Sequence, residues 1–174
     1  KKTKLAMKSL PEWMMISKIV IDNRNSFKLD NESEVKAIST SGDAGRSEAL
    51  SLLVIDEAAI IDTLDDLWAG LLPTLSTGGD CIVASTPKGV GNMFHKLYSE
   101  AEQGINDFNY MVLPWDKHPE RDQDWFEKER RNMSRREIAQ ELQCNFNMSG
   151  ETLLAGEDLE RIKNILEVPI YKTG

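Results

Sequence analysis

Two adjacent acids at the end of an apolar run are the strongest chemical signal in the sequence. Asp56 and Glu57 follow residues 50–55, which are almost continuously apolar, as a buried strand of a parallel sheet is. Ligands of open α/β folds bind where such strands end. There, Asp56 could hold a Mg²⁺ ion through its water shell, and Glu57 could orient and deprotonate an attacking water. The pair therefore predicts nucleotide hydrolysis, and the alternative is a polar cap at a strand end.

A second group of small polar residues follows about thirty residues later. Ser85 and Thr86 come directly after an apolar run and open the segment Ser-Thr-Pro-Lys-Gly. Their hydroxyls could hydrogen-bond to a phosphate or to an attacking water, although such a segment is also typical of an ordinary turn. If the preceding run forms the strand beside the acid-bearing one, the hydroxyls emerge next to Asp56 and Glu57. We then expect one shared cleft for magnesium and a nucleotide.

Arg46 is the third candidate, because it lies on a glycine-containing segment just before the acid-bearing strand. An arginine there could reach a γ-phosphate or the nucleotide of a neighbouring subunit, and the alternative is an arginine on a surface loop. The same segment is not a phosphate-binding loop of the form G-x-x-x-x-G-K-[ST]. That pattern needs glycine where Thr40 stands and lysine where Arg46 stands, and no other stretch of the 174 residues fits it.

Three apolar runs, separated by helical patterns, must position these residues. The predicted strands are residues 50–55, 81–84 and 110–113. Between them, apolar residues recur at spacings of three and four over residues 64–75, where Pro73 should kink or end the helix, and again over residues 93–101. Strand, helix, strand, helix, strand is the pattern of a parallel sheet with right-handed crossovers and flanking helices.

Before this pattern, the sequence predicts a small antiparallel excursion. Short strand-like segments end at residue 22 and cover residues 27–29 and 35–38, with turn residues between them.

After the third predicted strand, the sequence predicts helices. Asp124 could cap a helix that runs through Arg131, and Ser134 with Glu137 has the spacing of a capping box for the next helix. One short amphipathic helix is expected within residues 159–166.

Length and composition indicate one domain. The chain has 40% hydrophobic residues, enough for a single core, and no apolar stretch of the roughly 20 residues that a membrane helix needs. There is no signal peptide pattern, and two cysteines do not make a disulfide framework, so both are expected to be reduced core residues of a cytoplasmic protein. The chain starts without an initiator methionine, and we expect it to be an internal piece of a longer protein.

The net charge of −8 argues against a domain that wraps DNA by charge alone. Any DNA contact would have to be local, or be made by parts outside this chain. Basic clusters at residues 1–8 and 130–136 could also be solvated faces.

Taken together, an ordered set of motifs resembles the large terminase family of tailed phages, the ATPase motors that package double-stranded DNA into procapsids. The motifs are Gly-Arg-Ser at residues 45–47, LLVIDEAAIID at 52–62, ASTPKG at 84–89, LPWDKHPER at 113–121, IAQELQCNF at 138–146 and SGETLL at 149–154. The resemblance covers roughly residues 10–155.

The resemblance implies an α/β fold of the P-loop NTPase kind, helicase-like, truncated in its N-terminal part. It implies that Asp56 is the Walker B aspartate, that Glu57 is the catalytic glutamate, and that Ser85 and Thr86 belong to a coupling motif. Relatives often have Arg-Gly where this chain has Arg46-Ser47, which weakens the transfer of a nucleotide-binding role to Arg46. ATP and Mg²⁺ are the implied cofactors of the full-length protein.

The resemblance also implies partners and a division of the chain. The implied partners are double-stranded DNA, the portal protein, the small terminase subunit and further copies of the chain in a ring, in the host cytoplasm during virus assembly. Residues 1–148 would be the C-terminal part of the ATPase domain, and residues 149–174 a linker toward a nuclease domain. Because the Walker A loop is absent, we expect this chain alone to be inactive.

Two alternatives remain open at this stage. A superfamily 2 helicase or translocase shares an acid pair and a Ser/Thr motif, although its usual Asp-Glu-Ala-Asp or Asp-Glu-x-His is not met, since alanines follow Glu57. A non-catalytic module that docks on a portal or capsid protein could use Trp68, Trp115 and Trp125 as hot spots, although these tryptophans could equally fill the core.

Overall fold

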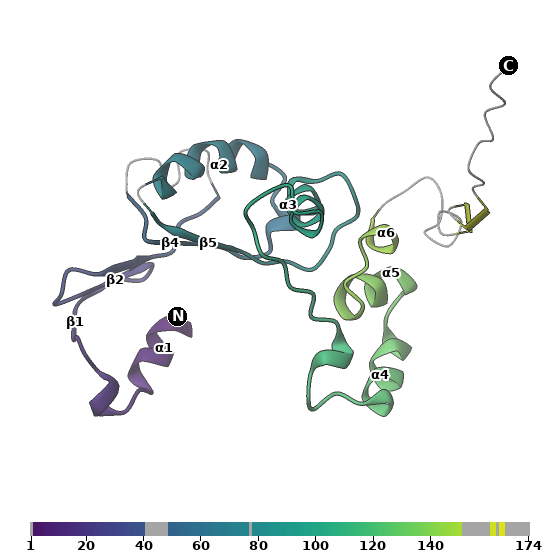
Figure 1. Ribbon diagram of the computed structural model, residues 1–174. Helices are drawn as coiled ribbons and strands as arrows, with labels where there is room; N and C mark the ends of the chain where they lie inside the picture. Colours follow the sequence, from purple (N-terminus) through teal and green to yellow (C-terminus); the bar gives the residue numbers. More distant parts are fainter. Residues whose placement is uncertain (1, 41–48, 77, 151–160, 163, 166–174) are drawn as a thin grey trace, which may run out of the picture.

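The computed structural model describes residues 2–40, 49–76, 78–150, 161, 162, 164 and 165. Figure 1 shows three successive parts: an N-terminal helix with a small sheet, a central α/β part, and a group of short helices. Both an antiparallel and a parallel sheet are present, which confirms the mixed α/β class.

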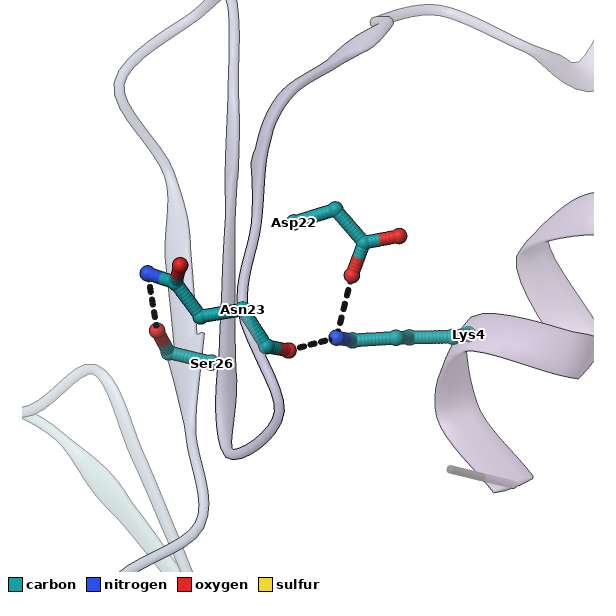
Figure 2. Close-up of polar contacts among 4 residues, drawn as sticks. All are labelled: Lys4, Asp22, Asn23 and Ser26. Carbon is teal, nitrogen blue, oxygen red and sulfur yellow. Dashed lines mark hydrogen bonds and ion pairs between the residues drawn. The ribbon is translucent and has the colours of Figure 1, made fainter.

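The N-terminal part is a helix beside a three-stranded antiparallel sheet of order β1-β2-β3, as the sequence predicts. Its elements are α1 (Lys2–Lys8), β1 (Ile19–Asp22), β2 (Ser26–Leu29) and β3 (Glu34–Lys36). Figure 2 shows the tie between them: the Lys4 ammonium donates to the carboxylate of Asp22 and to the carbonyl of Asn23. The hydrogen bond from Lys4 lowers the pKa of Asp22.

The central part is a β-α-β unit whose two strands pair in parallel. Its elements are β4 (Leu52–Ile55), α2 (Leu64–Leu71), β5 (Asp80–Val83) and α3 (Met93–Glu102). As predicted, α2 ends before Pro73 and continues as one 3-10 turn. Apolar residues of β4, the 3-10 turn after it, α2 and α3 meet in one core: Leu53, Ile55, Ala58, Leu64, Leu67, Trp68, Leu71 and Leu97.

One face of this parallel sheet is bare among the described residues. Side chains alternate between the faces of a strand, so while Leu53 and Ile55 are buried, Leu52, Val54 and Ile82 are 54%, 58% and 52% exposed. The expectation of a strand buried on both faces is therefore wrong for this chain. The helices that cover the sheet contribute to a single core on one side, and nothing described lies over the other.

The prediction of a third strand at residues 110–113 is also wrong. This segment belongs to no helix or strand, and Met111 is 78% exposed. An apolar run becomes a strand only where it lies along a partner edge that accepts its hydrogen bonds, and residues 110–113 pair with neither β4 nor β5. Tyr110 instead packs edge-on against Tyr98 of α3.

The last part contains short helical segments. They are α4 (Gln123–Glu129), α5 (Arg135–Glu137), a π-helix (Ile138–Leu142) and α6 (Phe146–Ser149). The cap of α4 is Asp122, not Asp124, because the Asp122 carboxylate is the one that accepts from the Trp125 backbone N–H, at 2.8 Å. The helix ends at Glu129, before the predicted Arg131, and a 3-10 turn follows.

The capping box is confirmed. The Ser134 hydroxyl accepts from the Glu137 backbone N–H, and the Glu137 carboxylate accepts from the Ser134 backbone N–H. Of the helix expected within residues 159–166, positions 161, 162, 164 and 165 are helical and the rest lie outside the described residues. Cys81 and Cys144 are both free thiols, as expected. A search of the described residues finds no helix long and apolar enough to cross a membrane.

Candidate functional site

The two strand ends that carry the candidate residues lie side by side. The register pairs Ile55 of β4 with Val83 of β5. Beyond it, the Ala84 backbone N–H donates to the Ile55 carbonyl at 2.9 Å, and the Ala58 N–H donates to the Ala84 carbonyl at 3.1 Å. The backbone after both strands is therefore joined by hydrogen bonds. This is the juxtaposition that the sequence pattern predicts.

The acid pair is exposed at this edge, held by a tight turn. The Asp56 carboxylate accepts from the Glu57 backbone N–H at 3.1 Å. Glu57 has φ 52° and ψ 40°, the left-handed region, which is uncommon for a residue other than glycine. Ala58 and Ala59 follow in a buried 3-10 turn. Two small buried residues thus anchor the turn and leave both carboxylates in solvent.

Ser85 connects the two strand ends. Its hydroxyl accepts from the Ala59 backbone N–H at 3.1 Å and donates its hydrogen to the Thr86 carbonyl at 2.8 Å. A hydroxyl has a single hydrogen to donate. In this arrangement Ser85 holds the acid-bearing turn against the loop after β5, and its hydrogen is already used.

Thr86 is half-buried and faces a residue that the sequence analysis did not single out. Its hydroxyl lies 3.5 Å from the carboxylate oxygen Oε1 of Glu141, a residue 55 positions further along the chain. Glu141 lies within the motif IAQELQCNF, which contributed to the family resemblance but carried no chemical assignment. No local pattern marks it.

The loop after β5 is fixed to the end of the helical part. Ser149 is fully buried; its hydroxyl accepts from the Gly89 backbone N–H at 2.9 Å, and its carbonyl accepts from Arg136 Nε at 3.1 Å. Gly89 has φ +71°, and a Cβ atom there would lie 2.7 Å from the Cα of Gly150. Only glycine therefore allows the two backbones to approach this closely.

A cavity of about 260 Å³ lies beside these residues. It is lined by Ala58, Ala59, Ile61, Asp62, Leu64, Asp65, Lys88, Asn92 and Met93, and the Lys88 ammonium lies 3.9 Å from the Asp62 carboxylate. None of the four predicted site residues that the structure describes (Asp56, Glu57, Ser85 and Thr86) lines it. The cavity adjoins the strand ends, and it is not the predicted nucleotide cleft itself.

The donor set fits a magnesium ion that a nucleotide would share. In the described part of the chain, no group of three or more His, Cys, Asp or Glu side chains could hold a metal. Mg²⁺ needs no such group, because it keeps several waters and binds through one or two carboxylates plus phosphate oxygens. Asp56 is the exposed carboxylate that could serve. Arg46 lies outside the described residues.

Comparison with known proteins identifies the fold. No protein-family model matches the sequence. Among solved structures, the chain is similar in fold to the ATPase domain of a phage large terminase, which confirms the resemblance found in the sequence. The similar structures are the large terminase ATPase domain of Thermus phage P74-26, with 23% identity and a TM-score of 0.54, and a mutant of that domain, with 21% identity and a TM-score of 0.56.

The match leaves a part of the phage domain without a counterpart. It covers 75% of this chain in both cases, but 63% and 64% of the phage chains. The chain thus spans less than two thirds of the structures that it resembles.

Proposed function

We propose that this chain is part of the ATPase motor of a viral large terminase, which couples ATP hydrolysis to the packaging of double-stranded DNA into procapsids. One observation carries the proposal. The exposed acid pair Asp56-Glu57 and the hydroxyl pair Ser85-Thr86 stand at neighbouring ends of two parallel strands. That is the edge at which α/β folds bind ligands, and the fold is similar to a terminase ATPase domain.

Each residue has a distinct part in the proposed reaction. Mg²⁺ supplies charge neutralisation on the ATP phosphates, and Asp56 holds it through its water shell. Glu57 orients the attacking water and takes its proton. Thr86 presents its hydroxyl to the phosphate or to that water, and Ser85 keeps the two strand ends together. Arg46 is proposed to reach the nucleotide from the preceding segment.

The proposal concerns a larger protein. Backbone N–H groups and a lysine of a phosphate-binding loop must hold the β- and γ-phosphates, and no stretch of the 174 residues has that pattern. Residues 1–148 are proposed to be the C-terminal part of the ATPase domain. Residues 149–174 are proposed to lead to a nuclease domain, although Ser149 itself is packed into the helical part.

The proposed partners follow from the same function. They are double-stranded DNA, the portal protein, the small terminase subunit and further copies of the chain in a ring, in the host cytoplasm. With a net charge of −8, this chain would contact DNA only locally, or through parts of the protein outside it.

The test is ATP hydrolysis by the complete protein that carries these residues. Glu57→Gln should lower kcat by about a hundredfold or more, because a positioned general base contributes roughly that much. Asp56→Asn should also lower kcat strongly, because it removes the charge that holds Mg²⁺. Asp66→Asn, an exposed acid on α2, is the matched control and should leave turnover unchanged. Unchanged turnover in the Asp56 and Glu57 variants would refute the motor and favour a docking module.

The chain by itself should not hydrolyse ATP. Residues 1–174 lack the groups that hold the terminal phosphates, so we expect no turnover above background. A purified chain with activity that disappears on Glu57→Gln would show that this expectation is wrong.

A further inference from the structure

Glu141 is brought to the candidate site by an uncommon piece of backbone. It lies in the π-helix Ile138–Leu142, where the Gln143 N–H donates to the Ile138 carbonyl at 3.0 Å. Such i→i+5 turns are rare and are found often at functional sites. Here the π-helix places an exposed carboxylate next to Thr86.

Other contacts hold Glu141 in place independently of Thr86. Ser149, at the end of α6, is bonded to Gly89 of the loop. The Phe146 ring packs against His95 and Tyr98 of α3, each with ring centroids 5.0 Å apart. The helix that follows Glu141, α6, is therefore docked on the central part, and the fold places the Glu141 carboxylate beside Thr86.

The contact restricts what the Thr86 hydroxyl can do. An ionised carboxylate only accepts hydrogen bonds, so the single hydroxyl hydrogen of Thr86 points to Glu141. A phosphate oxygen also only accepts. Thr86 therefore cannot donate to a phosphate and to Glu141 at the same time. At 3.5 Å the bond is long, hence weak enough for a phosphate to displace.

We propose that Glu141 is a positioning residue that competes with the terminal phosphate of the nucleotide for the Thr86 hydroxyl hydrogen, an inference that rests on the proposed ATPase function. Without nucleotide, Thr86 donates to Glu141. When the nucleotide binds, the hydroxyl turns to the phosphate and Glu141 is released. The contact between the loop after β5 and the π-helix is therefore present in one state and lost in the other, while the Gly89–Ser149 bond persists.

The experiment measures the Kd of a non-hydrolysable Mg-ATP analogue and the kcat for ATP in the complete protein. Glu141→Ala removes the competitor, so the Kd should fall about two- to fivefold, the worth of one weak hydrogen bond. Glu141→Gln keeps a carbonyl acceptor but loses the charge, so the Kd of this variant should lie between those of the unchanged protein and Glu141→Ala. In the Thr86→Val background, where no hydroxyl remains, neither change at Glu141 should alter the Kd.

The variants separate the inference from two simpler explanations. If Glu141 acts only by repelling the anionic nucleotide, Glu141→Gln will match Glu141→Ala and both effects will persist in the Thr86→Val background. If Glu141 is only structural, Kd will rise or kcat will fall regardless of Thr86. Either result overturns the inference, as does an unchanged Kd in Glu141→Ala.

Two further comparisons are needed: a control substitution beside the π-helix, and the Asp56 variant, which tests the ATPase function separately. Gln143→Ala, an exposed residue just beyond the π-helix, should leave Kd and kcat unchanged. Full turnover in Asp56→Asn would refute the ATPase function itself. Lost turnover in Asp56→Asn together with a Glu141→Ala effect independent of Thr86 would refute only the role of Glu141.

Discussion

At the scale of single residues, Glu57 combines a proposed catalytic role with an uncommon backbone conformation. Glu57 is one of three non-glycine residues in the described part of the chain with positive φ. A left-handed conformation costs such a residue roughly 1–2 kcal/mol, and strained positions of this kind cluster at active sites. The turn at Glu57 therefore lowers the stability of the fold, and it places an exposed carboxylate beside Asp56 at the strand end.

The strain at Glu57 can be measured with a pair of substitutions. Glu57→Gly should be more stable than Glu57→Ala by about 0.5–1 kcal/mol, because glycine avoids the left-handed penalty but has more freedom in the unfolded chain. Urea unfolding of both variants measures the difference. The same pair at Asp66 of α2 is the control and should show the opposite order, since glycine weakens a helix. Equal stability at position 57 would contradict the argument.

The capping box makes a prediction about pH. The backbone N–H of Ser134, followed by its side chain, holds the pKa of Glu137 below its usual value of 4.5. Because the folded-state pKa is depressed, this interaction stabilises the fold above pH 4.5, and the stabilisation is lost as the pH falls through the lower folded-state value. In Ser134→Ala, an NMR titration should show the Glu137 pKa moved part of the way back up.

The backbone N–H of residue 134 remains in that variant, so full return to the usual pKa is not expected. Ser134→Thr keeps a hydroxyl and is the control. A Glu137 pKa that Ser134→Ala leaves unchanged would show that the backbone bond alone is responsible.

At the scale of elements, the important feature is the attachment of the loop after β5 to the helical part. Pro87 is fully buried, and the Gly89 N–H donates to the buried Ser149 hydroxyl. Packing of Phe146 on α3 adds a second attachment. The loop that carries Thr86 is therefore held from both sides, by the strand ends and by α6.

The close approach at Gly89 predicts a large effect of one methyl group. In Gly89→Ala, the added Cβ meets the Gly150 Cα at 2.7 Å, and because both are backbone no side chain can turn away. Gly91→Ala is the matched control: its φ is also positive, at +88°, but no atom lies within 4 Å of the added Cβ. Gly89→Ala should be less stable by about 1–3 kcal/mol more than Gly91→Ala, the usual cost of overpacking. Equal losses of stability in the two variants, measured by thermal or urea unfolding, would contradict this prediction.

At the scale of the whole molecule, apolar surface remains exposed on the described residues. Leu52, Val54 and Ile82 form the bare face of the parallel sheet. Trp13 and Ile16, in the connection between α1 and β1, are 82% and 96% exposed. Parallel sheets are normally covered on both faces, and unpaired strand edges invite pairing with another chain.

We therefore expect the isolated chain to self-associate. Size-exclusion chromatography with light scattering should give a mass above that of one chain, and Val54→Lys should reduce it by placing a charge on the bare face. Leu72→Lys is the control, because Leu72 is similarly exposed, at 52%, but lies outside the sheet. A clean monomer at all concentrations would count against the idea.

The amino-acid sequence by itself determined the features that depend on neighbours along the chain. Three features were predicted: the apolar runs of β4 and β5, the end of α2 before Pro73 and the Ser134–Glu137 capping box. Each rests on hydrogen bonds or packing patterns within a few residues. The neighbouring position of the two strand ends that carry the acid pair and Ser85-Thr86 was also predicted, because parallel strands joined by a helix end at one edge.

Tertiary structure decided what depends on distant partners. Residues 110–113 are as apolar as a strand, yet they pair with neither β4 nor β5, and Val54 is apolar, yet nothing described covers it. Glu141 and Ser149 reach the loop across 55 and 60 residues of chain, distances over which no local periodicity carries information. The residues that hold Thr86 in place are set by how the helical part packs on the β4–β5 unit, and only the folded chain shows them.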